Sequence, residues 1–139
     1  MADIYEKRVI GFDLAYRMVA EAAAKAREIG VPQVIAVVDD TGYLKAFARM
    51  DGAPLMCEEI AASKAFTALF GMPTDQFFGA LNEDPSLRAG LFHRPRIAAF
   101  GGGLPIKTGN AIVGAIGVSG GTAEQDIECA RAALELVKE

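Results

Sequence analysis

Eight of the fifteen glycines in this 139-residue chain lie in one segment, GGGLPIKTGNAIVGAIGVSGGT, which spans residues 101–122. Glycine tolerates sharp turns and lets another backbone approach closely, so this segment constrains the fold more than any other. Lys107-Thr108-Gly109-Asn110 separates two strand-like runs and is typical of a hairpin turn. We expect Gly114 and Gly117 to admit a close backbone or ligand, and Gly120-Gly121 to turn the chain into a helix.

Two catalytic patterns can be tested on the same segment. A phosphate-binding loop does not fit, because Ile106 occupies the position of its second glycine and Lys107-Thr108 lies in a turn rather than at a helix start. Residues 117–121 do match the G-x-S-x-G pattern of a nucleophile elbow. However, the only histidine, His93, precedes Ser119, whereas α/β-hydrolases have the order serine, acid, histidine. We therefore interpret the glycine turn mainly as a structural element. Binding of a carboxylate or phosphate at the following helix N-terminus is the second interpretation.

Composition narrows the classes of partner. The net charge of −4 and the isoelectric point near 5.0 give no basic field that would attract nucleic acid. No apolar run approaches the ~18 residues that would span a membrane, and the N-terminus lacks an apolar signal core, so we expect a cytoplasmic protein. The spacing of Cys57 and Cys129 is not that of a metal site, which favours buried free thiols.

The order of predicted elements indicates one α+β domain over residues 1–139, with helices packed on an antiparallel sheet of about five strands. The last helix begins with a predicted capping box formed by Thr122 and Gln125. Helices are expected at residues 3–29, 54–70, 73–81 and 122–138, strands at 34–39, 43–50, 96–100, 104–107 and 111–119, and an irregular loop at 82–96.

Several phrases resemble the GlcG/HbpS-like family of haem-degrading or haem-binding domains, which includes the C-terminal domain of PduO. They are VVDDTGYLKAFARMDGA, EIAASKAFTA and FGGGLPI…VGAIGVSGGTAEQD, and the resemblance covers residues 5–137. It implies a three-layer α-β-α sandwich on an antiparallel sheet and a homo-oligomer, either a dimer or larger. Some members bind haem, some act with iron or in redox sensing, and others are encoded beside glycolate or propanediol catabolism.

The resemblance implies haem as a possible cofactor, but one feature of the family is missing. Some haem-binding relatives present a histidine from the first helix, and residues 3–29 contain none. We expect no dedicated metal site. If haem binds, His93 is the axial candidate, beside Arg94 and Arg96, which would face the propionates. The other possible iron ligands are Met50, Met56, Met72, Cys57 and the tyrosines.

Charged residues supply further candidates. Arg49 and Asp51 flank a predicted strand-to-helix turn, where Arg49 would clamp a carboxylate. Lys64 on the following helix would transfer a proton if it is partly buried. The structural alternative is that these residues form an ion pair, or that their charged groups lie in solvent while the aliphatic parts of their side chains pack on the protein. Asp126 in the first turn of the last helix would complement the helix dipole or bind a basic group.

Three functions remain open from the sequence: a haem-binding module, an enzyme or accessory protein acting on a small carboxylate in organic-acid or aromatic catabolism, and a structural or assembly domain. The sequence does not decide whether the chain is an enzyme. The candidate catalytic residues are Lys64, Ser119 and His93. The candidate ligand-binding residues are Arg49, Asp51, Gly102, Gly103, Ser119, Gly120 and Arg94.

Overall fold

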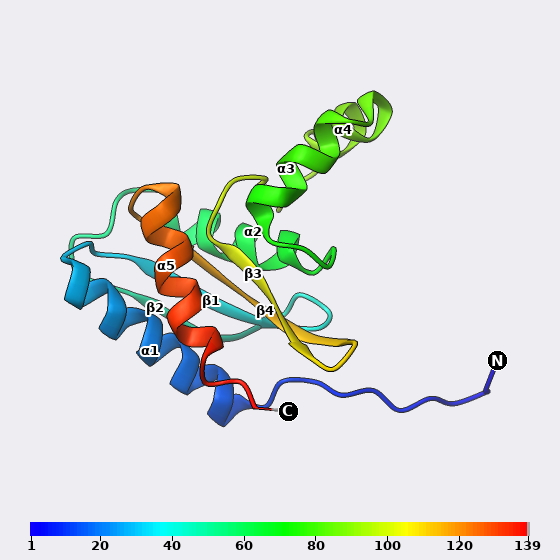
Figure 1. The fold of residues 1–139 in the computed structure, drawn as a ribbon, viewed down its shortest axis with the longest axis horizontal. Coiled ribbons are helices and arrows are strands. Elements are labelled where there is room, and N and C mark those ends of the chain that lie inside the picture. Colours follow the sequence, from blue (N-terminus) through cyan, green and yellow to red (C-terminus); the bar gives the residue numbers. More distant parts are fainter. Residues whose placement is uncertain (139) are drawn as a thin grey trace.

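The computed structural model describes residues 1–138 and shows an α+β fold, as predicted (Figure 1). Within this range, no helix is long and apolar enough to cross a membrane. The helices are α1 (Phe12–Ile29), α2 (Cys57–Ala68), α3 (Thr74–Asn82), α4 (Pro85–Leu91) and α5 (Ala123–Leu134). The strands are β1 (Val34–Asp39), β2 (Leu44–Arg49), β3 (Gly103–Thr108) and β4 (Ala111–Ser119).

The four strands form one antiparallel sheet in the order β2-β1-β4-β3. The prediction of about five strands is wrong, because residues 96–100 form no strand. The hydroxyl of Thr67 donates to the carbonyl of Arg96 and accepts from the amide of Ala98, both at 2.9 Å. Since a side chain binds the backbone groups that a neighbouring strand would bind, this segment does not join the sheet.

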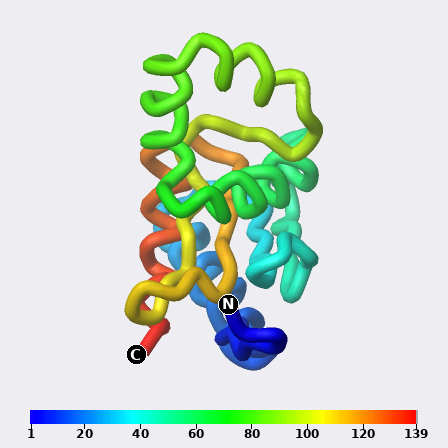
Figure 2. Tube along the Cα trace, turned by 90° about the vertical axis from the view of Figure 1, so that its right-hand side faces the viewer, coloured from blue at the N-terminus to red at the C-terminus, as the bar shows by residue number. Residues whose placement is uncertain are grey.

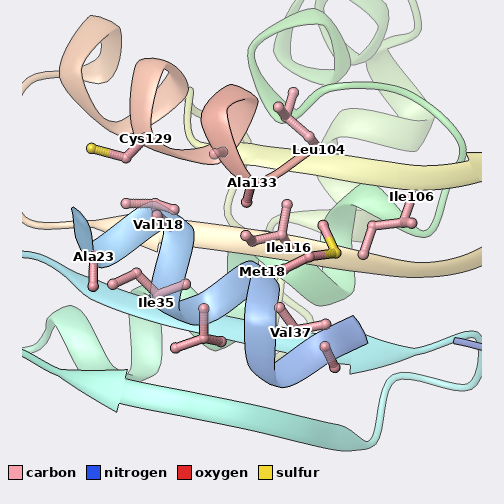
Figure 3. Close-up of a cluster of buried hydrophobic side chains, with 14 of the residues drawn as sticks. Met18, Ala23, Ile35, Val37, Leu104, Ile106, Ile116, Val118, Cys129 and Ala133 are labelled. Carbon is pink, nitrogen blue, oxygen red and sulfur yellow. The ribbon is translucent and has the colours of Figure 1, made fainter. Parts of the chain in front are cut away.

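Helices cover both faces of the sheet (Figure 1). On one face α1 and α5 pack together over side chains such as Ile35 of β1 and Ile116 of β4, with Met18 of α1 among them (Figure 3). On the other face α2 packs against side chains such as Ala36 and Ala115. Because successive strand residues point to opposite faces, the continuous apolar runs of β1 and β4 fill both cores.

The predicted close approach at Gly117 is confirmed, and the approaching group is protein backbone. A Cβ at Gly117 would overlap the carbonyl of Ala61 and lie 2.6 Å from the amide nitrogen of Ala65 on α2. Both alanines are fully buried. The small residues on α2 and β4 therefore let the helix lie directly on the strand.

The first helix begins at Phe12 and not near Asp3, so the prediction of a helix over residues 3–29 is wrong at its start. Residues 1–9 are exposed and form an extended segment that leads away from the body of the molecule (Figure 1). Ile10 is only 3% exposed, and its amide donates a hydrogen bond to the carbonyl of Val113 at 2.9 Å. Ile10 is thus a core residue that binds β4 from an extended segment. Its spacing of four residues from Leu14 had instead suggested that it lies on the face of a helix.

The predicted irregular loop over residues 82–96 contains α4. Asp84 caps this helix by accepting a hydrogen bond from the amide of Leu87 at 3.1 Å, and Pro85 occupies its first position. α3 and α4 project beyond the end of the sheet (Figures 1 and 2). A small cluster that includes Phe77 and Leu81 holds α3 against the segment that leads into β3.

The two cysteines are buried free thiols, as predicted. Burial raises the pKa of the Cys129 thiol to about 11, so this side chain stays protonated and unreactive at neutral pH. In the described part of the chain, no three His, Cys, Asp or Glu side chains gather as a possible metal site.

Candidate functional site

Lys64 and Asp126 form a buried ion pair that connects α2 to α5. The Nζ atom of Lys64 donates to Oδ2 of Asp126 and to the carbonyl of Val118, both at 2.9 Å. The two side chains are only 1% and 4% exposed. Burial lowers the pKa of Lys64, while the hydrogen bond and charge of Asp126 oppose that shift. Because α2 and α5 lie on opposite faces of the sheet, this pair ties the two faces together.

Two glycines make room for this pair. A Cβ at Gly102, where φ is +131°, would overlap the carbonyl of Val118 and lie 2.8 Å from Nζ of Lys64. A Cβ at Gly103 would overlap the backbone carbonyl of Lys64. We call Lys64, Gly102, Gly103, Val118 and Asp126 the layer junction. Its glycines accommodate protein groups, and Lys64 has no open path to solvent.

The turn before α5 also binds groups of the protein itself. The amide of Gly121 donates to Oδ1 of Asp126 at 2.9 Å, so this anion position is filled by an internal carboxylate. The predicted capping box is confirmed, since Thr122 and Gln125 each accept a hydrogen bond from the other's amide. Gly120, at φ +151°, lies against Gln33, where a Cβ would contact the carbonyl of Pro32. The role of Gly120 in ligand binding stays a prediction.

Ser119 is the last residue of β4 and is paired opposite Val34. Its residue exposure is 4%, whereas His93 is exposed after α4. Within residues 1–138, no hydrogen bond joins Ser119 to His93. The structure therefore does not bring together the nucleophile and base that a serine mechanism requires.

Arg49 lies at the end of β2, and its Nε atom is 3.4 Å from Oε1 of Glu58. These two residues and Glu59 line a hollow of about 600 Å³ at the start of α2. Two carboxylates beside one guanidinium repel an external acid. Asp51 is exposed in the following turn and does not line this hollow. Binding of a carboxylate by Arg49 stays a prediction, which its pairing with Glu58 does not favour.

A different surface has the character of a ligand site. A shallow hollow of about 570 Å³ lies between α3 and the segment that leads into β3. Three phenylalanines on it, Phe78, Phe92 and Phe100, are 48%, 45% and 50% exposed, which is unusual for side chains of this size. We call this hollow the phenylalanine surface. It is lined by Asp75, Phe78, Phe92, Ile97, Ala98, Ala99, Phe100 and Gly101.

The phenylalanine surface is held rigidly from below. The hydroxyl of Thr74, at the start of α3, donates to the carbonyl of Phe100 at 2.6 Å and accepts from the amide of Gly103 at 2.9 Å. The ring of Phe100 lies over Nζ of Lys64, which is 4.8 Å from the ring centroid. The layer junction therefore forms part of the support under this surface.

His93 lies beside the phenylalanine surface. It lines a second hollow of about 290 Å³ together with Arg88 and Phe92, and Phe92 lines both hollows. Arg94 is exposed in the same loop. Arg96 points elsewhere, because its guanidinium lies 3.9 Å from the centroid of Phe66 and donates to the carbonyl of Gly42 at 2.6 Å. The prediction that Arg96 would face a ligand in this loop is therefore not supported by its contacts.

Of the other possible iron ligands, Cys57, Met50, Met56 and the tyrosines do not line this surface, whereas Met72 packs on the apolar cluster beneath it, which includes Ala99. Cys57 is buried at the start of α2, and Met56 lines the hollow that contains Arg49. Met50 and Met72 pack against apolar core clusters. Phe78 and Phe100 were not among the residues predicted from the sequence to bind a ligand. Phe78 falls in the helix expected at residues 73–81 and Phe100 in the strand expected at 96–100, where a phenylalanine predicts a core side chain.

Comparisons with known proteins agree with the fold. The family model described as "Haem degrading protein HbpS-like" matches residues 10–135. The chain is 40% identical over 127 residues to an uncharacterized 15.0 kDa protein from the dhaT-dhaS intergenic region of Citrobacter freundii, covering 90% of this chain and 89% of that protein.

Two solved structures extend this similarity. Klebsiella pneumoniae protein ORFY is 36% identical, with a TM-score of 0.91, covering 98% of this chain and 95% of that chain. The PduOC:haem complex is 28% identical, with a TM-score of 0.85, covering 93% of this chain and 95% of that chain. The resemblance seen in the sequence is thus confirmed, and the chain belongs to the HbpS-like family.

Proposed function

We propose that this chain binds haem on the phenylalanine surface, with His93 as the axial ligand. The observation that carries the proposal is the position of three exposed phenylalanines next to the only histidine of the sequence. Membership of the HbpS-like family and the similarity to the PduOC:haem complex support the same ligand.

The residues present fit the chemistry of haem. Exposed aromatic and aliphatic side chains suit a flat apolar macrocycle, and a hollow of about 570 Å³ is within the usual size of ligand sites. An imidazole nitrogen of His93 is a common iron ligand. The guanidinium groups of Arg88 and Arg94 would attract the propionates. When bound, haem supplies redox and oxygen chemistry at its iron.

The chain's own residues would determine selectivity. The phenylalanine rings exclude water from one side of the ligand, and the firm attachment of Phe100 through Thr74 fixes the floor of the hollow. Asp75 is the acidic residue at the rim, so the anionic end of a ligand would point away from it, toward Arg88 and Arg94. A small hydrophilic acid would gain little from this apolar hollow.

The test is a titration with haemin followed by absorbance. We expect the His93→Ala variant to shift the Soret band and to weaken binding about tenfold or more. Phe78→Ser should weaken binding by about tenfold without moving the band, because it removes apolar contact but no ligand. Phe47→Ser is the matched control, since Phe47 is 40% exposed on β2, and it should leave the titration unchanged.

Two results would contradict the proposal. Unmodified protein that produces no saturable Soret change would show that haem is not a ligand. A saturable change that is the same in the His93→Ala and Phe78→Ser variants would place haem elsewhere on the chain.

A further inference from the structure

The phenylalanine surface has two walls that come from different parts of the chain. One wall is α3, which supplies Asp75 and Phe78, and the other is the segment of residues 97–101. An apolar cluster that includes Phe77 and Ala99 packs the two walls together. Apolar contacts have no preferred direction, so this cluster does not by itself fix the tilt of α3 against the segment. A fixed width of the hollow therefore requires a directional contact.

Thr74, the first residue of α3, makes that contact. Its hydroxyl donates to the carbonyl of Phe100 and accepts from the amide of Gly103. In the part of the chain that the structure describes, no other residue of α3 forms a hydrogen bond or ion pair with residues 96–103. Thr74 is fully buried and does not line the hollow. It can therefore act on a ligand only through the groups that it holds.

The segment is held on its other sides without Thr74. The hydroxyl of Thr67 on α2 binds the carbonyl of Arg96 and the amide of Ala98, and the side chain of Arg96 adds a further hydrogen bond and a ring contact. At the other end, the carbonyl of Gly102 accepts a hydrogen bond from β4 at 2.9 Å. Loss of the Thr74 hydroxyl would thus leave the segment in place and release α3.

We propose that Thr74 is a positioning residue for the ligand, because its hydroxyl sets the spacing between Phe78 on α3 and Phe100 on the segment. The inference rests on the proposed function, since this hollow is the proposed haem site. Walls that are already spaced bind a flat, rigid ring system without the entropy cost of ordering α3. A flexible apolar chain gains less from fixed walls, so Thr74 favours flat, rigid ligands.

The test compares Thr74→Val with Thr67→Val. Each change removes a fully buried hydroxyl that donates one hydrogen bond to the backbone of residues 96–103 and accepts another from it. Both variants should therefore lower the midpoint of urea denaturation by similar amounts. A residue with a merely structural role would show this effect and no other.

The haemin titration separates the two threonines. Thr74→Val should raise the dissociation constant about tenfold without moving the Soret band, because the spacing of the walls changes and His93 does not. Thr67→Val should change the dissociation constant by less than about twofold, because its hydroxyl does not bind α3. Thr74→Ser keeps the hydroxyl and should restore most of the affinity. If Thr74→Val does not fold, Thr74→Ala and Thr67→Ala replace the pair.

Hydrogen–deuterium exchange without haemin gives a second readout. Thr74→Val should speed exchange of the amides of α3, whereas Thr67→Val should not. Unchanged exchange in α3 of Thr74→Val would overturn the inference whether or not haemin binds. Equal haemin affinity of Thr74→Val and Thr67→Val would overturn it and leave the proposed function standing, as would a Soret band that moves in Thr74→Val. Unmodified protein that does not bind haemin would overturn the proposed function and this inference together.

Discussion

The layer junction and the phenylalanine surface meet at Phe100 but are built in opposite ways. At the junction, Lys64 and Asp126 are almost fully buried and hydrogen-bonded, and glycines give them space. On the phenylalanine surface, large apolar rings are exposed and few polar groups accompany them. Lys64, Asp126 and the two glycines beside them thus stabilise the fold, while the phenylalanine rings form an apolar surface that is open to solvent.

The largest effect is expected from breaking the junction's ion pair. In Lys64→Met, the carboxylate of Asp126 is left buried with its charge uncompensated. The free energy of unfolding should fall by about 3–5 kcal/mol in a urea titration. Lys64→Met combined with Asp126→Asn should lose less than the single variant, because the unpaired charge is gone. A single variant within about 1 kcal/mol of the unmodified protein would show that the pair is not structural.

Gly117→Ala tests the close contact of α2 with β4. The added methyl group would overlap backbone atoms of Ala61, so the helix must move away from the strand. We expect the free energy of unfolding to fall by about 3 kcal/mol, at the upper end of overpacking effects. Gly79→Ala is the control, because Gly79 lies in α3 with no atom within 4 Å of its added Cβ. That variant should gain up to about 1 kcal/mol. If the two variants changed the free energy of unfolding by the same amount, the close packing of α2 on β4 would be contradicted.

Two adjacent residues sharpen the comparison further. Phe77 is 4% exposed and stacks on Phe70, with ring centroids 4.9 Å apart, whereas Phe78 is 48% exposed. Phe77→Ser should cost about 3 kcal/mol of unfolding free energy, measured by thermal or urea denaturation. Phe78→Ser should change it by less than about 1 kcal/mol. If Phe78→Ser destabilised the protein as much as Phe77→Ser, the phenylalanine surface would be part of the core.

Much of the fold could be predicted from the sequence because its signals are local. The apolar run of β1, the turn at residues 107–110 and the capping box at Thr122 each depend on a few neighbouring residues, and each prediction is confirmed. The strand predicted at residues 96–100 failed for a non-local reason. Its backbone groups are bound by Thr67, about thirty residues earlier in the chain, and no local pattern reveals that contact.

The candidate site was less predictable than the fold. Lys64 and Asp126 were singled out separately, and only the folded chain shows that they satisfy each other's charge. His93 was singled out because it is the only imidazole in the sequence and imidazole binds iron. That reasoning needed no knowledge of which residues surround it. Phe78 and Phe100 were not found, because a phenylalanine in a sequence normally predicts core. Phe78 lies on α3, which projects from the sheet (Figure 2), and the exposure of both rings is a property of the folded chain that no local pattern reveals.

Hydrogen–deuterium exchange with and without haemin tests the central claim most directly, because it reports on both regions in one experiment. We expect haemin to slow exchange in peptides that cover residues 75–101, which include α3, α4 and the phenylalanine surface. Peptides that cover residues 117–126 should exchange slowly in both states, because the junction is already buried and bonded. Protection by haemin confined to α1, or to residues 117–126, would contradict the account and place the ligand away from the phenylalanine surface.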